Sequence, residues 1–204
     1  EHFALEYADK MVPWWLSKGV YPLYFVWESG LFDILRQFVL GRRDVFDYTS
    51  DPVWEGVLKS PGSLAWSAMK KSARLSSSTD AGSGYPGGAY LFADQLAERH
   101  AGGALGKLRV HAVGHSAGSI FHAHLLPLLA RQNVPIDTLH LLAPAIRLDL
   151  FKQTLLPLLQ DGSIGRLHLF TMEDEAERAD DCLTVYRKSL LYLVSRAFEG
   201  FRSC

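Results

Sequence analysis

The run GHSAG at residues 114–118 has the spacing of a serine nucleophile. In the pattern G-x-S-x-G, the serine stands on a sharp turn between a strand and a helix, and a backbone N–H at the helix start can stabilise an oxyanion. Ser116 would be the nucleophile of an acyl-transfer reaction and the Ala117 N–H a donor to the oxyanion. The alternative is that Ser116 only caps an ordinary helix after a glycine-rich turn.

Both flanks of this run favour the nucleophile. The residues KLRVHAV at 107–113 predict a short buried strand, and apolar residues spaced by three and four after Ser116 predict a helix. We expect Pro127 to kink or end that helix, because proline has no N–H and its ring crowds the carbonyl of Ala123. The two glycines of the motif, 114 and 118, are expected to relieve crowding across the turn.

The rest of the chain alternates between helical and strand patterns. Apolar periodicity predicts helices at 3–17, 31–41, 90–100, 149–159 and 183–199, and strands at 20–27, 138–142 and 166–172. This alternation predicts an α/β fold with a mostly parallel sheet and helices on both faces. The adjacent Trp14 and Trp15 are interpreted as packing residues.

One segment, 42–88, breaks the regular pattern. Its second half is rich in Ser, Gly and Pro, and its periodicity is weak. We expect a lid or a partly disordered insertion, with Trp54, Leu58, Leu64 and Trp66 apolar enough to cover a cleft.

Composition narrows the function classes. The 204 residues are 48% hydrophobic and 21% charged, which is typical of one globular domain, and the net charge of -1 gives no reason to expect a nucleic-acid partner. No apolar run is long enough for a membrane span. Cys182 and Cys204 have neither metal nor disulfide spacing, which favours a reducing, cytoplasmic compartment. Nothing in the sequence indicates an oligomeric state.

The strand-turn-helix around GHSAG, followed by HLLAPA on the next strand, resembles the α/β-hydrolase family. The resemblance implies a three-layer sandwich in which Ser116 is the nucleophile and the acid follows the strand at 166–172. The acid then belongs to the loop EDEAERADD, residues 173–181. Asp174 is favoured over Glu173 and Glu175, because loops of the family present the acid within a few residues of the strand end and pointing toward the nucleophile, whereas Asp180 and Asp181 could instead cap the last helix. The other carboxylates of the loop stay open as alternatives.

No residue of this chain matches the catalytic histidine of the family. In the family the histidine follows the acid, but all eight histidines of this chain precede residue 173. We therefore expect the histidine beyond Cys204 and the second oxyanion donor before Glu1. The single domain, residues 1–204, would then be incomplete at both ends, with 20–27 as the family's fourth strand. On the rival assignment, 20–27 is the third strand and the base is unexplained.

The sequence thus predicts a serine hydrolase, similar to a carboxylesterase or lipase, acting on an ester or related acyl bond of a small-molecule substrate. No metal and no organic cofactor are expected. The 204-residue chain itself is expected to be nearly inactive, because it lacks the base. The alternatives are a non-catalytic binding scaffold of the same fold and an acyltransferase that uses the same serine.

Overall fold

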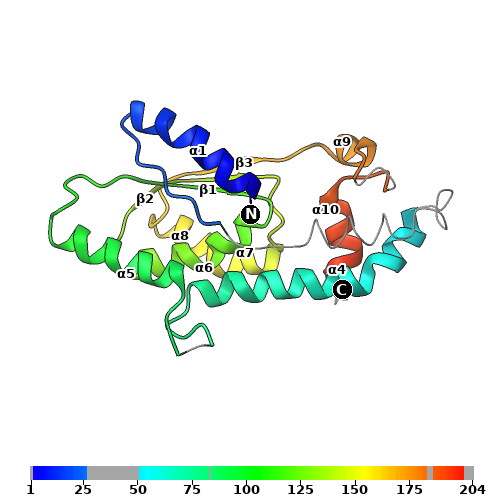
Figure 1. Ribbon diagram of the computed structural model, residues 1–204, viewed down its shortest axis with the longest axis horizontal. Coiled ribbons are helices and arrows are strands. Elements are labelled where there is room, and N and C mark those ends of the chain that lie inside the picture. The colour runs from blue at the N-terminus through cyan, green and yellow to red at the C-terminus, as the bar shows by residue number, and fades with distance from the viewer. Residues whose placement is uncertain (1, 27–50, 83, 183–185, 200–204) are drawn as a thin grey trace.

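The chain has an α/β fold built on a small parallel sheet (Figure 1). The computed structural model describes residues 2–26, 51–82, 84–182 and 186–199. The elements are α1 (His2–Ser17), α4 (Asp51–Ser76), α5 (Gly88–Ala101), β1 (Val110–His115), α6 (Gly118–Arg131), β2 (Ile136–Leu142), α7 (Leu148–Thr154), α8 (Leu156–Gln160), β3 (Leu167–Phe170), α9 (Asp174–Ala179), α10 (Leu190–Leu193) and the π-helical turn η1 (Val194–Phe198).

The sheet holds three parallel strands in the order β1-β2-β3. Parallel neighbours need a crossover, and α6 connects β1 to β2 while α7 and α8 connect β2 to β3. The parallel sheet predicted from the alternating pattern is therefore confirmed. Because the strands run in register, β1 and β2 end together, with His115 opposite Leu142.

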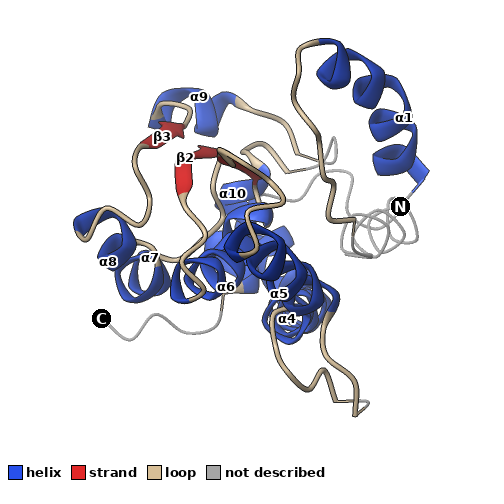
Figure 2. Cartoon of the chain, turned by 90° about the vertical axis from the view of Figure 1, so that its left-hand side faces the viewer, coloured by secondary structure: helices blue, strands red, loops and turns tan. Residues whose placement is uncertain are grey.

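Helix α6 covers one face of the sheet (Figure 2). Ala112, Leu139 and Leu141 point into a core with the apolar side chains of α6. The opposite face is different: in the described part of the chain, His111 and His115 are exposed there, and Val113 is 61% exposed. The described residues therefore do not show a helix layer on each face, and the three-layer sandwich stays a prediction.

The segment expected as a lid or disordered insertion is largely a core helix. Residues 51–76 form α4, and Leu58, Trp66 and Met69 of this helix are buried in a second core cluster with residues near the C-terminus. The prediction was wrong for this part of the segment. Leu58, Trp66, Met69 and Ala73 follow one another at steps of 8, 3 and 4 residues, so they lie on one face of the helix, and this face is buried. Residues 42–50 and the side chain of Trp54 lie outside the described residues.

Hydrogen bonds to two glutamates connect the C-terminal segment to α4. Glu199 accepts hydrogen bonds from Trp66 Nε1 (2.6 Å) and Lys70 Nζ (2.8 Å). Tyr186 Oη donates to Glu55 Oε1 at 2.8 Å. These bonds join residues more than a hundred positions apart in the sequence. They hold the segment that contains α10 and η1 against α4.

The predicted strand at 20–27 is wrong over residues 20–26, which form no strand. The run is extended but pairs with no described strand, and Tyr21 is 83% exposed. Phe25 instead packs its ring on those of Phe92 (5.3 Å) and Phe121 (4.8 Å). A residue composition typical of a strand does not produce one unless a neighbouring strand is available to pair with it. Residue 27 and the helix expected at 31–41 lie outside the described residues.

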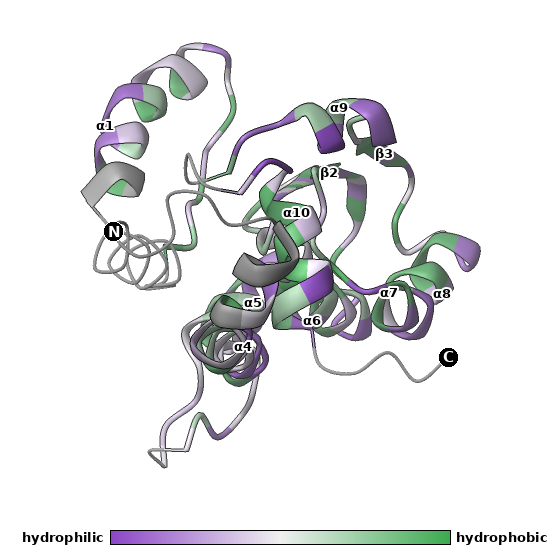
Figure 3. Ribbon diagram, turned by 90° about the vertical axis from the view of Figure 1, so that its right-hand side faces the viewer, coloured by the Kyte–Doolittle hydropathy of each residue, from purple (hydrophilic) through white to green (hydrophobic). Residues whose placement is uncertain are grey.

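Helix α1 lies apart from the layer of α4, α5 and α6 (Figure 3). None of the side chains described in it is buried. Trp14 and Trp15 contact each other edge to face at 4.7 Å, and Trp14 is about half exposed. The packing interpretation is therefore wrong for Trp14 as a core residue, whereas Trp15 is half-buried.

Two helix ends differ from expectation. Helix α6 continues through Pro127 to Arg131, because the buried leucines on both sides of the proline hold the helix in the core despite the lost hydrogen bond. The last helix begins at Leu190 instead of 183, and Ser189 caps it by accepting a bond from the Tyr192 N–H (3.2 Å). Asp180 and Asp181 do not cap it.

His122 gives the folded state a dependence on pH. This buried side chain of α6 donates from Nε2 to the Val113 carbonyl (3.0 Å), and its buried Nδ1 has no partner in the described residues. Burial lowers the pKa of His122, and the bond to Val113 opposes this only in part. The folded state thus disfavours the charged ring.

We expect the free energy of unfolding to be highest above the pKa of an unfolded histidine, about 6.5, and to fall as the pH drops towards the lowered pKa of His122. His122→Gln keeps an N–H donor but cannot titrate, so its loss of stability between about pH 7 and about pH 5 should be smaller. Urea unfolding of both proteins at each pH measures this. Equal losses in the two proteins would contradict the assignment.

Candidate active site

Ser116 stands on the sharp turn between β1 and α6, as the motif predicts. The strand ends at His115, the helix begins at Gly118, and Ser116 has a φ of 50°. A side chain in this left-handed region costs roughly 1–2 kcal/mol, because Cβ crowds the following carbonyl. The surrounding structure must therefore hold the turn in place.

Backbone bonds from the end of β2 hold this strained turn. The Ser116 N–H donates to the Leu142 carbonyl at 2.9 Å, and the Ser116 carbonyl accepts from the Ala145 N–H at 3.2 Å. The fully buried Ser119 adds its hydroxyl, which donates to the Ser116 carbonyl at 2.6 Å and accepts from the Ile146 N–H at 3.0 Å. Sequence reasoning missed Ser119, although a hydroxyl three residues after the nucleophile was a usable signal.

The two glycines of the motif have different roles. A Cβ on Gly114 would lie 2.8 Å from His122 Cδ2 and 2.9 Å from the backbone carbon of Gly118, so the turn has no room for a side chain there. A Cβ on Gly118 would meet nothing within 4 Å. Crowding explains Gly114 and does not explain Gly118, which corrects the expectation for the second glycine.

The helix N-terminus beside Ser116 offers unused donors. In the described part of the chain, the N–H groups of Ala117 and Gly118 donate no hydrogen bond. Unpaired N–H groups at the start of a helix carry partial positive charge and favour an anion. The N–H groups of Ala117 and Gly118 are therefore available to bind an anion beside Ser116, and the donor on Gly118 was not named from the sequence.

The Ser116 side chain is half-buried and unengaged. No described residue hydrogen-bonds to its hydroxyl, and this includes every histidine whose side chain is described. Three of these histidine rings are hydrogen-bonded to other residues: His111 and His140 both bond Thr138, and His122 bonds Val113. His115 is exposed beside the turn. Among the described residues, no base is in place to activate Ser116.

The acid loop after β3 is folded as helix α9. Both carboxylate oxygens of Asp174 are engaged, one by the Tyr192 hydroxyl and the other by Arg178 Nε at 2.9 Å. Asp180 Oδ1 accepts from the Asp181 N–H at 2.9 Å. Glu177, the buried carboxylate of this helix, accepts a short bond from the Ser189 hydroxyl. No contact joins Ser116 to Asp174 or to another carboxylate of 173–181 among the described residues.

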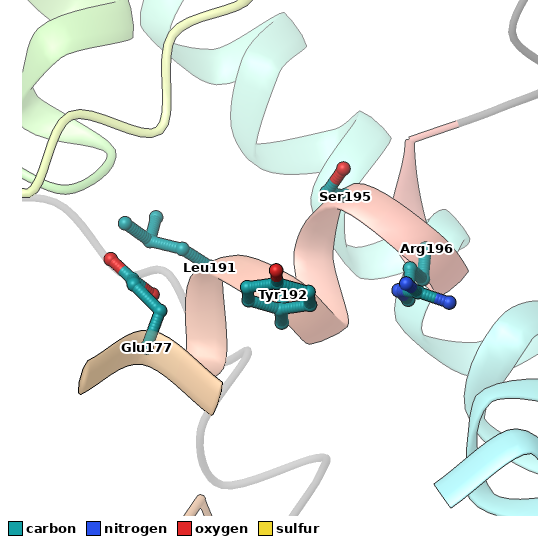
Figure 4. A pocket seen from close by; sticks show the side chains of 5 residues that line it. All are labelled: Glu177, Leu191, Tyr192, Ser195 and Arg196. Carbon is teal, nitrogen blue, oxygen red and sulfur yellow. The ribbon is translucent and has the colours of Figure 1, made fainter. Parts of the chain in front are cut away.

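An open cavity lies against α9 and the last helix. Its volume is about 390 Å³, and Glu177, Tyr192 and Arg196 are among its lining residues (Figure 4). The Tyr192 ring stands between the carboxylate and the guanidinium, with Arg196 5.5 Å from the ring centroid. Neither Ser116 nor Asp174 lines this cavity. We therefore do not treat it as the substrate site of Ser116.

The buried thiol of Cys182 takes no part in this chemistry. Burial, with Asp180 and Asp181 nearby, raises the pKa of Cys182 to about 11. A thiol with such a pKa is protonated and weakly nucleophilic at neutral pH. Cys204 lies outside the described residues.

No group of three or more His, Cys, Asp or Glu side chains within the described ranges is arranged to hold a metal ion. None of the described helices combines the length and the apolar character needed to cross a bilayer. No family model matches the chain, and neither a curated protein nor a solved structure shows significant similarity to it.

The different surroundings of the two glycines give a matched pair of substitutions. Gly114→Ala should destabilise the protein by about 1–3 kcal/mol, since its methyl group overlaps Gly118 backbone and the His122 ring. Gly118→Ala should be neutral or stabilising by up to about 1 kcal/mol, because the site is open and helical. Chemical denaturation of the two variants measures both effects. Equal destabilisation by the two alanines would contradict this geometry.

The strain at Ser116 can be measured directly. Ser116→Gly should stabilise the protein by about 0.5–1 kcal/mol, because glycine adopts a positive φ without the Cβ penalty. Ala117→Gly, at a helical φ of -60°, should instead destabilise it by about 0.5–1 kcal/mol. Thermal unfolding distinguishes the opposite signs. A loss of stability in Ser116→Gly as large as that in Ala117→Gly would show that the turn stores no strain.

Proposed function

We propose that the chain carries the nucleophile and part of the oxyanion site of a serine hydrolase that acts on esters or related acyl bonds. The observation that carries the proposal is the half-buried hydroxyl of Ser116 at a positive φ, beside the unpaired N–H of Ala117. The parallel strands, with Ser116 directly after the carboxyl end of β1, also support an α/β-hydrolase-like, three-layer fold.

The proposed reaction follows from these positions. Ser116 Oγ attacks the acyl carbon while a base takes its proton, and the N–H groups of Ala117 and Gly118 stabilise the negative charge on the substrate oxygen. The leaving group departs with a proton, and water then releases the acid from Ser116. The base is a histidine that the described residues do not bring to Ser116.

The acid of the proposed triad is Asp174, in keeping with its place after β3. Each carboxylate oxygen of Asp174 has one partner, Tyr192 or Arg178, and keeps a lone pair that can accept a histidine N–H. Asp180 is the alternative, since only the neighbouring backbone N–H engages its side chain. Both carboxylates are on the surface and accessible to such a partner.

A non-catalytic scaffold of the same fold is the second candidate. It is favoured by one specific observation, the absence of any described histidine hydrogen-bonded to Ser116. An acyltransferase would use the same residues as the hydrolase and differ only in whether an alcohol or an amine replaces water.

Reaction with a fluorophosphonate tests the hydrolase proposal. We expect an adduct on Ser116, formed about 10²–10⁴-fold more slowly than in an enzyme with a positioned base. Ser116→Ala should form none, and Ser163→Ala, which removes a hydroxyl near the amino end of β3, should react like the parent chain. Peptide mass spectrometry identifies the modified residue.

One outcome of this experiment would count against the proposal, and a separate assay tests the expected inactivity of the chain. Absence of a Ser116 adduct on the folded protein would favour the binding scaffold. Rapid turnover of a nitrophenyl ester by the 204-residue chain, lost in Ser116→Ala, would show instead that a base already reaches the serine and that the expectation of near inactivity is wrong.

A further inference from the structure

A positively charged pocket lies where α4, α6 and α7 end. Figure 1 shows α4 running beside α6, and the pocket, with a volume of about 310 Å³, opens at their C-terminal halves. Six polar side chains line it: Arg74, Ser77, Ser78, His124, Arg131 and Thr154. The lining includes no carboxylate. The volume is at the lower end of the range for small-molecule sites.

The two guanidinium groups are not neutralised within the described part of the chain. Arg74 and Arg131 form no ion pair and no hydrogen bond with any described residue. His124 does not add to this charge at neutral pH, because burial lowers its pKa and the nearby Arg74 lowers it further. The positive charge of the pocket comes from the two exposed arginines, which have no counterion among the described residues.

Capping of helix ends does not account for these arginines. Cations favour helix C-termini because the last carbonyls lack partners. In α4, however, the carbonyls of Arg74 and Leu75 already accept from Ser77 N and Ser78 N, at 3.2 and 3.0 Å. In α6, the Leu129 and Ala130 carbonyls accept from backbone N–H groups of residues 132–134 at 3.0–3.1 Å. The guanidinium groups remain available for another partner.

Hydroxyl groups complete the donor set. Ser77 Oγ has no hydrogen-bond partner in the described residues, but it is buried and not accessible from the pocket. Ser78 Oγ accepts from the Asp80 N–H at 3.3 Å and keeps its own O–H free to donate. Thr154 already donates to the Leu150 carbonyl at 2.7 Å. The unused donors thus come from α4, α6 and the residues after α4.

We propose that this pocket binds a small-molecule phosphate monoester, with the phosphoryl group held by Arg74 and Arg131 and by the hydroxyl of Ser78. Guanidinium groups match phosphate oxygens with paired N–H donors, and a phosphoryl group can accept from several sides where a carboxylate has only two oxygens. The proposal depends on the pocket alone and is independent of the chemistry at Ser116.

Calorimetric titration with inorganic phosphate and with glycerol phosphate tests the proposal, with acetate at matched ionic strength as the comparison. We expect both phosphates to bind with a Kd of about 1 mM or lower and acetate at least about tenfold more weakly. Arg74→Gln and Arg131→Gln should each weaken phosphate binding about tenfold. The control Arg166→Gln removes the same charge from an exposed position outside the pocket and should change the affinity less than about twofold.

Two further measurements separate the proposal from its rivals. Vesicles that contain phosphatidic acid should not compete with glycerol phosphate. The apolar side chains of the lining are Ala123 and Pro127, which are too few to hold the acyl chains of a lipid. Competition would identify a lipid headgroup as the ligand and overturn the small-molecule proposal. Without phosphate, Arg74→Gln and Arg131→Gln should unfold at the same temperature as the parent or higher, since like charges repel.

The opposite result would assign the arginines a structural role. Lower stability of both variants without phosphate, together with phosphate affinities equal to that of Arg166→Gln, would show that Arg74 and Arg131 stabilise the C-terminal ends of their helices. Absence of phosphate binding up to about 10 mM by the folded parent chain would likewise overturn the proposal.

Discussion

The positive φ of Ser116 is the constraint on which the candidate site depends. A single residue must reverse the chain between β1 and α6, and it does so with a side chain in a region that favours glycine. The bonds that hold it come from Leu142, the last residue of β2, and from Ala145 after the strand. The register between β1 and β2 therefore positions Ser116, because a shift of the strands would move both partners away from the turn.

Local patterns predicted the elements that depend on short-range spacing. Helices α1, α5 and α6 and strands β1, β2 and β3 overlap the segments where periodicity placed them, although β1 begins and ends later than predicted, and their alternation implied the parallel sheet. The failures lie where distant contacts decide the outcome. Residues 20–26 have the composition of a strand but pack aromatic rings instead, and α4 is stabilised by residues from the other end of the chain. Propensity is a weak guide when tertiary packing supplies most of the stabilisation.

The same division applies to the candidate site. The motif was sufficient to place Ser116 and Ala117, because four neighbouring residues determine the turn. Ser119, whose buried hydroxyl bonds the turn, was not anticipated, since its role depends on a contact with Ile146, 27 residues away in the segment after β2. The engagement of Asp174 by Tyr192 could not be read from spacing either, because the two residues come from different helices. Long-range partners of a site residue require a structure.

A strained serine supports a catalytic hypothesis only together with its surroundings. Asn133 and Ala143 also have positive φ values, of 59° and 42°. Asn133 follows Gln132, the C-cap residue of α6, at a position where asparagine tolerates the left-handed region, and Ala143 has no group that could react. Ser116 differs because the same turn presents an unengaged hydroxyl and unpaired N–H groups on one side. Strain that a protein maintains at such a place is better explained by chemistry than by folding, since glycine would form the same turn at lower cost.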